Sequence, residues 1–140
     1  MLGIALALAI TGTVAYHLVT KLMPAGAHPI ATLLTAYVFG SVLCAGILLA
    51  TPGEAGLRGH FAQVNWTAPA LAVVVVVIDL AFILLYRSGF PVSLGALVTQ
   101  ASAAIALIAL GWLFFKDRLT ATHLAGVALC LAGLWLVNRD

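Results

Sequence analysis

Long apolar runs, separated by short polar breaks, make up most of the chain. A helix needs about 20 mostly apolar residues to cross the hydrocarbon part of a bilayer. Five runs qualify: Leu2–Lys21, Pro29–Ala50, Trp66–Tyr86, Pro91–Phe115 and Ala121–Val137. A β-barrel is not expected, because its strands are short and alternate between apolar and polar positions. The pattern predicts an all-α polytopic membrane protein, a bundle of five transmembrane helices in one domain over residues 1–140.

Most of the polar breaks are only a few residues long, which makes consecutive helices antiparallel neighbours. Pro29 and Pro91 lie in the first turns of their predicted helices, where the missing N–H costs no hydrogen bond. The exception is the stretch TPGEAGLRGHFAQVN, residues 51–65, which is polar and rich in glycine. We expect it to be a loop.

Composition supports the membrane assignment and removes several classes of function. Of the 140 residues, 64% are hydrophobic and 7% are charged, whereas a soluble domain has about 25% charged residues. The net charge of +2 is too small to suggest a nucleic-acid partner. The first run lacks the basic start of a signal peptide, so we expect it to be retained as a helix.

Residues that build metal, redox or catalytic sites are few and scattered. Cys44 and Cys130 lie inside apolar runs and are expected to be core residues without a disulfide. The four histidines do not cluster, so we expect no metal, and no motif indicates a cofactor. No pair of catalytic groups lies at one interface, so we do not expect an enzyme.

The basic residues of the predicted loops are balanced across the membrane. Orientation normally follows an excess of Lys and Arg on the cytoplasmic side. Five spans would place three basic residues on one side of the membrane, namely Arg58, Lys116 and Arg118. The other side would hold three as well, namely Lys21, Arg87 and Arg139. Either other features fix one orientation, or copies insert both ways (dual topology) and pair head to tail, like the inverted repeats of many transporters.

One acid, Asp79, lies inside the apolar run Val73–Tyr86. It is about 4–5 Å from the middle of its predicted helix, at ~1.5 Å per residue, too deep for so short a side chain to snorkel. Intramembrane carboxylates usually face a bundle interior or a wet cavity, and desolvation disfavours their charged form. Asp79 is a candidate for trading a proton for a cation. The alternative is a protonated or hydrogen-bonded acid that locks the third predicted helix to the fourth or the first.

Other polar residues in the predicted helices are candidates for lining a transport path. Tyr86, about two turns along the same helical face, and Gln100 and His17 are candidate partners of Asp79. The full set of candidate pathway residues is Thr13, Tyr16, His17, Asp79, Tyr86, Thr99, Gln100 and Ser102. The polar residues of this set also have a structural interpretation, because Thr can bond its own backbone and uncharged polar side chains often bridge two helices.

Small residues follow one face of the last predicted helix. Gly126, Cys130 and Gly133 lie on this face, and the two glycines are about two turns apart. Small stripes let helix backbones approach closely in lipid. The face is a candidate dimer interface, and packing within the same chain is the alternative.

The C-terminal part resembles the drug/metabolite transporter superfamily. In LGWLFFKDRLTATHLAGVALCLAGLWLV (Leu110–Val137) an aromatic-leucine end, an acidic-Arg-Leu turn and a helix with spaced glycines follow one another. The matching residues are Phe114, Phe115, Asp117, Arg118, Leu119, Gly126 and Gly133. The preceding LLYRSGFPVSLGALVTQASAAIALI is similar to the third-to-fourth helix junction of EamA-type repeats. The resemblance is good over about residues 70–137 and looser before them.

The resemblance implies a transporter built from paired repeats. Ten-helix members of that superfamily contain two five-helix repeats of opposite orientation, and the four-helix small multidrug resistance members dimerise through a last helix with spaced glycines. This chain resembles one five-helix repeat, which implies a homodimer, parallel or antiparallel, or a pair with a paralogous subunit. The essential glutamate of the four-helix members aligns with Ala9 here. The resemblance therefore does not imply that this chain uses an acid at that position for antiport.

The sequence as a whole favours a secondary transporter in the lipid bilayer of the inner (plasma) membrane. It would move a small metabolite or amphipathic compound by alternating access, as a dimer, with Asp79 as the proton-coupling acid. Two alternatives stay open: a flippase for a lipid-linked sugar, and a non-transporting subunit of a larger membrane complex.

Overall fold

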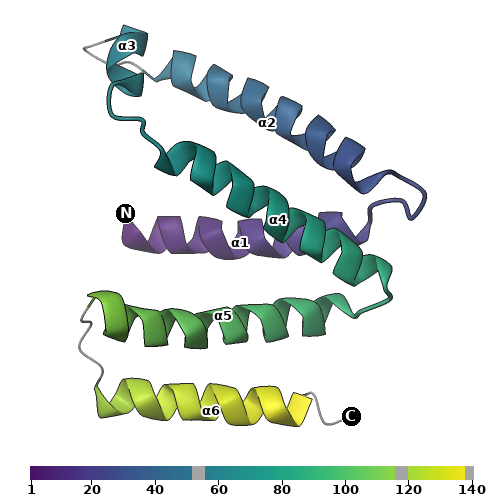
Figure 1. The fold of residues 1–140 in the computed structure, drawn as a ribbon, viewed down its shortest axis with the longest axis vertical. Helices are drawn as coiled ribbons and strands as arrows, with labels where there is room; N and C mark the ends of the chain where they lie inside the picture. Colours follow the sequence, from purple (N-terminus) through teal and green to yellow (C-terminus); the bar gives the residue numbers. More distant parts are fainter. Residues whose placement is uncertain (52–55, 116–119, 138–140) are drawn as a thin grey trace. The chain divides into compact units, whose positions relative to one another are not determined.

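The structure, a computed structural model, describes residues 1–51, 56–115 and 120–137, most of them in helices (Figure 1). The described part forms α1 (Leu2–Lys21), α2 (Pro29–Ala50), α3 (Gly56–Phe61), α4 (Thr67–Arg87), α5 (Val92–Phe115) and α6 (Ala121–Val137). It contains no strand, so the expected all-α class is confirmed for these residues. The five longer helices begin and end within one residue of the bounds expected from the apolar runs.

Four of the described helices, α1, α2, α4 and α5, are long and apolar enough to cross a membrane. Helix α6 has 17 residues, which at ~1.5 Å per residue span about 26 Å, less than the ~30 Å of a typical hydrocarbon core. The four helices suggest a membrane protein, and the fifth span stays a prediction.

The outside of the helices is apolar. Among the described residues, the buried hydrophobic side chains are Leu33, Ile83 and Tyr86, whereas leucines, valines and isoleucines are exposed along every long helix. Soluble proteins rarely expose large continuous apolar surfaces. Acyl chains can cover such a surface, so the exposure pattern agrees with helices that face lipid.

Some expectations concern residues outside the described part. These are the basic residues Lys116, Arg118 and Arg139, the signature residues Asp117 and Leu119, and the side chains of Arg58 and Phe115.

Local interactions explain where α4 begins and where its connection to α5 turns. The side-chain oxygen of Asn65 accepts hydrogen bonds from the backbone N–H of Thr67 at 3.0 Å and from its hydroxyl at 2.8 Å. Asn is a favoured residue before a helix because it supplies such an acceptor. In the turn after Arg87, Gly89 has a φ of 91°, a conformation that glycine adopts without a steric cost.

The expected loop over residues 51–65 contains the short helix α3 (Gly56–Phe61), so the expectation of a loop was wrong for these six residues. Turn hydrogen bonds follow it directly, from the Ala62 N–H to the Gly59 carbonyl and from the Val64 N–H to the Phe61 carbonyl. A helix of fewer than two turns is too short to show an apolar period, and the glycines in and around it favour a turn prediction.

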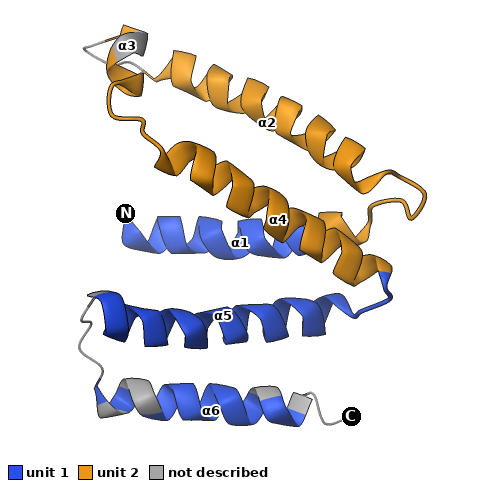
Figure 2. Cartoon of the chain, viewed as in Figure 1, with its two compact units in different colours: residues 1–18, 88–140 blue, residues 19–87 orange. Residues whose placement is uncertain are grey.

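The chain divides into two compact units (Figure 2). Unit 1 comprises Met1–Leu18 and Ser88–Asp140, and unit 2 comprises Val19–Arg87. Within unit 1, α5 packs against α6, and within unit 2, α2 packs against α4 (Figure 1). Asp79 and its helix therefore belong to unit 2.

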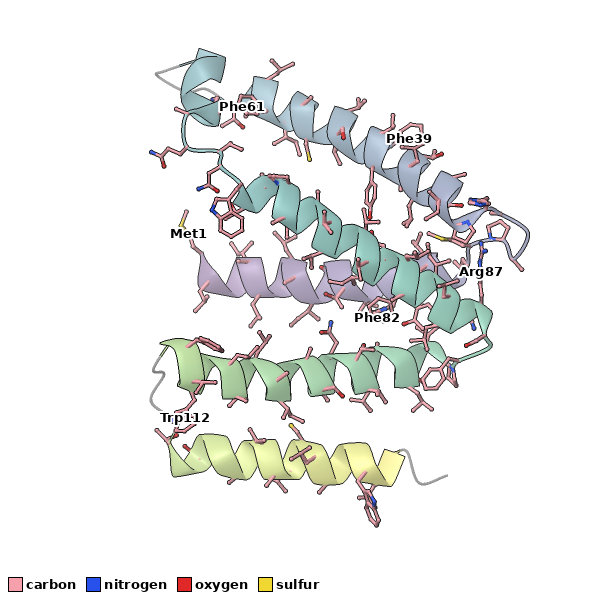
Figure 3. All side chains as sticks on the ribbon, in the orientation of Figure 1. Met1, Phe39, Phe61, Phe82, Arg87 and Trp112 are labelled. Atoms are coloured by element: carbon pink, nitrogen blue, oxygen red, sulfur yellow. The ribbon has the colours of Figure 1, made fainter. Side chains whose placement is uncertain are left out.

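Two basic side chains fasten one end of unit 2. Lys21 Nζ donates to the Tyr86 carbonyl oxygen at 3.2 Å and lies 5.9 Å from the centre of the Tyr86 ring. Arg87 Nη2 donates to the carbonyl oxygens of Pro24 at 3.1 Å and Ala27 at 2.6 Å, and Figure 3 labels it where α4 ends beside the α1–α2 connection. The last carbonyls of a helix lack partners within the helix, so Lys21 satisfies one of them. The α1–α2 connection is thereby attached to the end of α4.

We predict that Arg87→Met lowers the free energy of unfolding by about 1–3 kcal/mol, because hydrogen bonds from a charged donor to two carbonyls are lost. Lys21→Met removes one carbonyl bond and should cost less. Reversible unfolding in mixed detergent micelles measures both values. Unchanged unfolding of Arg87→Met would mean that the end contact contributes no stability.

Candidate functional site

Asp79 on α4 is paired with Tyr37 on α2. The Tyr37 hydroxyl donates to Oδ2 of Asp79, with 2.7 Å between the two oxygens. Each residue lies about two turns from its helix end at Arg87 or Pro29, or ~12 Å at ~1.5 Å per residue. The pair therefore lies well inside two helices of membrane-spanning length.

The end contacts explain why these two side chains meet at the same depth. Arg87 bonds the Ala27 carbonyl just before α2 begins, which fixes the end of α4 beside the start of α2. Since the two helices run antiparallel, equal distances from this common end bring Tyr37 opposite Asp79. Phe39 is 72% exposed and points away from α4 (Figure 3), so Tyr37 belongs to the other side of α2.

Asp79 lies on the packed side of α4. On its own face Val75 and Val76 are 36% and 38% exposed, against 65% for Val73. One turn further, Ile83 is 1% exposed. Asp79 and Tyr37 are themselves half-buried. The acid thus points toward the interior of unit 2, as an intramembrane carboxylate is expected to do.

The pair can hold a proton in more than one way. An ionised carboxylate accepts the tyrosine hydrogen bond as a charge-assisted bond, which is roughly twice as strong as a neutral one. A carboxylate has about four acceptor positions, of which the Tyr37 hydroxyl fills one. If Asp79 takes up a proton, the Tyr37 hydroxyl can still bond the neutral acid. The Tyr37 hydroxyl can therefore remain the hydrogen-bond partner of the Asp79 carboxyl in both states.

Tyr37 was missing from the sequence-based candidates. The candidate partners were Tyr86, Gln100 and His17. Tyr86 packs on Phe82, with 5.8 Å between ring centres. Gln100 and His17 belong to unit 1, and a pairing of any of the three with Asp79 stays a prediction. The hydrogen bond from Tyr37 joins Asp79 to the second predicted helix, and a lock to the fourth or first predicted helix stays a prediction. The missed signal was depth, because antiparallel pairing of the second and third apolar runs puts Tyr37 level with Asp79.

The remaining pathway candidates lie in unit 1. Thr13 donates to the Ala9 carbonyl at 2.8 Å and Thr99 to the Gly95 carbonyl at 2.7 Å, as threonines in apolar helices often do. The Tyr16 and His17 rings meet edge to face, with 5.1 Å between centres, and His17 is buried.

Gln100 and Ser102 of α5 are exposed. Their part in a transport path stays a prediction.

The glycine face of α6 is open. A Cβ added at Gly126 or Gly133 would have no heavy atom within 4 Å, so side chains of the described residues do not pack on these glycines. Cys130 on this face is exposed, as is Cys44 on α2, and both thiols are free. The expectation that they are core residues was wrong, because an apolar helix surface in lipid needs no protein cover.

Comparison with known proteins gives no relative. No family model, curated protein or solved structure matches this chain. Within the described residues, no three His, Cys, Asp or Glu side chains are grouped to hold a metal ion. The Tyr37–Asp79 pair is the candidate site that the geometry supports.

We predict that Tyr37→Phe and Asp79→Asn have non-additive effects on stability. Their interaction energy in a double-mutant cycle should be about 0.5–2 kcal/mol, the range for interhelical hydrogen bonds and contacting residues. The measurement is unfolding in mixed micelles. Thr35→Val is the matched control, since its hydroxyl bonds the Ala31 carbonyl of its own helix, and it should show no coupling to Asp79→Asn. Additive effects of Tyr37→Phe and Asp79→Asn would contradict the pairing.

Proposed function

We propose that this chain is the subunit of a secondary transporter in the inner membrane. It moves a small metabolite or amphipathic compound by alternating access, and Asp79 couples this movement to protons. The observation that carries the proposal is the hydrogen bond of 2.7 Å between Tyr37 and Asp79 deep within two spanning-length helices.

The energetic argument starts from the cost of Asp79. An Asp at the centre of a membrane helix costs about 2.5–3.5 kcal/mol on insertion scales. A single interhelical hydrogen bond in a membrane averages only about 0.6 kcal/mol. The bond to Tyr37 offsets part of this cost, and an apolar residue at this position would not carry the cost at all. A proton-binding role gives a reason for keeping the acid.

The sequence supports a transporter that works as a pair. The chain resembles one five-helix repeat of the drug/metabolite transporter superfamily, and its predicted loops carry balanced basic charge. The exposed glycine face of α6 around Gly126 and Gly133 offers a surface for a second copy or a paralogous subunit, because small residues permit close helix contact in lipid. In this proposal α6 holds the dimer together and the other long helices line the path.

We predict that Asp79→Asn abolishes proton movement driven by a transported solute. The purified protein is reconstituted in liposomes loaded with a pH-sensitive dye, and amines, amino acids and other small metabolites are added in turn. For at least one solute the parent protein should move protons, and Asp79→Asn should reduce the rate at least tenfold, to that of empty liposomes.

Glu54→Gln is the control, since it removes an acid from the sequence between α2 and α3 and should leave the rate unchanged. Equal rates for Asp79→Asn and the parent would refute the coupling role. Absence of any solute-driven flux from the purified chain, together with a co-purifying partner, would favour a non-transporting subunit.

A further inference from the structure

We propose that Tyr37 is a positioning residue that holds α2 against α4 while Asp79 is ionised and loosens this contact when Asp79 binds a proton. The inference rests on the proposed function in one respect, because it takes Asp79 as the group that binds the proton. It adds a residue on another helix and a movement between two helices.

The hydroxyl groups of α2 single out Tyr37. Thr32, Thr35 and Ser41 donate to carbonyl oxygens of the preceding turn, namely those of His28, Ala31 and Tyr37, at 3.0, 2.9 and 2.7 Å. The Tyr37 hydroxyl instead crosses to α4 and reaches Asp79 at 2.7 Å. A change at the Asp79 carboxyl is therefore transmitted to α2 through this bond.

The strength of the bond depends on the charge of Asp79. A hydrogen bond to an ionised acceptor is roughly twice as strong as a neutral one. When a proton from water binds a carboxylate oxygen of Asp79, the acid becomes neutral and Tyr37 keeps its own proton. The contact between α2 and α4 then loses the charge-assisted part of its bond.

The end contacts decide where the helices separate. Lys21 and Arg87 bond backbone carbonyls, contacts in which Asp79 takes no part, so this end of unit 2 remains fastened. A weaker bond at Tyr37 should therefore let α2 and α4 move apart toward α3. Cys44 on α2 and Ala72 on α4 lie two turns closer to α3 than Tyr37 and Asp79 do. The antiparallel arrangement of the two helices places Cys44 and Ala72 at similar depth.

Other titratable groups in unit 2 must be separated from Asp79. By sequence, those on α2, on α4 and on the segments next to them are Lys21, His28, Tyr37, Cys44, Glu54, Arg58, His60, Tyr86 and Arg87. Asp79→Asn leaves all of them in place. Any pH response that persists in Asp79→Asn therefore does not come from Asp79.

The experiment measures the separation of α2 and α4 as a function of pH. Cys130→Ala leaves Cys44 as the labelling site for bimane, and Ala72→Trp supplies a short-range quencher on α4. The labelled protein in liposomes is titrated from alkaline to acidic pH, and the same titration is made with Tyr37→Phe, with Asp79→Asn and with Thr35→Val. Elution from a sizing column in detergent checks that each variant is folded.

The parent should lose quenching on acidification with one midpoint, and Thr35→Val should match it. Asp79→Asn should be weakly quenched at all pH values, because its amide is neutral. Tyr37→Phe should be weakly quenched too, because the bond that crosses from α2 to Asp79 is lost. A Tyr37→Phe protein that titrates like the parent overturns the inference, as does a parent whose quenching does not change with pH. If Tyr37→Phe fails to fold, the same titration with Tyr37→Met, which also lacks the hydroxyl, decides in its place.

This test can fail separately from the proposed function. If quenching responds as expected but no solute drives Asp79-dependent proton flux, the positioning role stands and the transport proposal falls. If flux depends on Asp79 but Tyr37→Phe titrates like the parent, the transport proposal stands and the role of Tyr37 falls.

Discussion

The hydrogen bond between the Tyr37 hydroxyl and the Asp79 carboxyl is the interaction on which the account depends. It joins two residues 42 positions apart in the sequence, each about two turns inside a helix of membrane-spanning length. A carboxyl in hydrocarbon needs a polar partner, and this bond supplies one without removing the ability of the acid to bind a proton. The same contact therefore contributes to the packing of α2 on α4 and involves the acid that we propose to bind protons.

The geometry of that contact is set at the end of unit 2. Lys21 and Arg87 use backbone carbonyls as acceptors and fasten the α1–α2 connection to the last turn of α4. Their positive charges thus have a structural role besides any effect on orientation in the membrane. With this end fixed, antiparallel helices of similar length bring residues of equal depth together, which places Tyr37 opposite Asp79.

The apolar runs predicted the bounds of the long helices, because a span of about 20 apolar residues is a strong and simple pattern. Asp79 was equally visible, as one acid in a run of valines and leucines. Tyr37 was not found, since a single tyrosine in an apolar run carries no signal until the helix pairing is known. The short helix α3 has no period to detect, and the exposure of Cys44 shows that an apolar sequence does not reveal whether protein or lipid covers a side chain.

The most direct test of the central claim is infrared difference spectroscopy of the protein in lipid, with ¹³C-labelled aspartate and a change of pH. The account predicts that a carboxylic acid band of Asp79 appears on acidification, is absent from Asp79→Asn, and lies at a different frequency in Tyr37→Phe, which lacks the hydroxyl that bonds Asp79. An Asp79 carboxyl that stays in one protonation state over the range in which the protein is folded would contradict it.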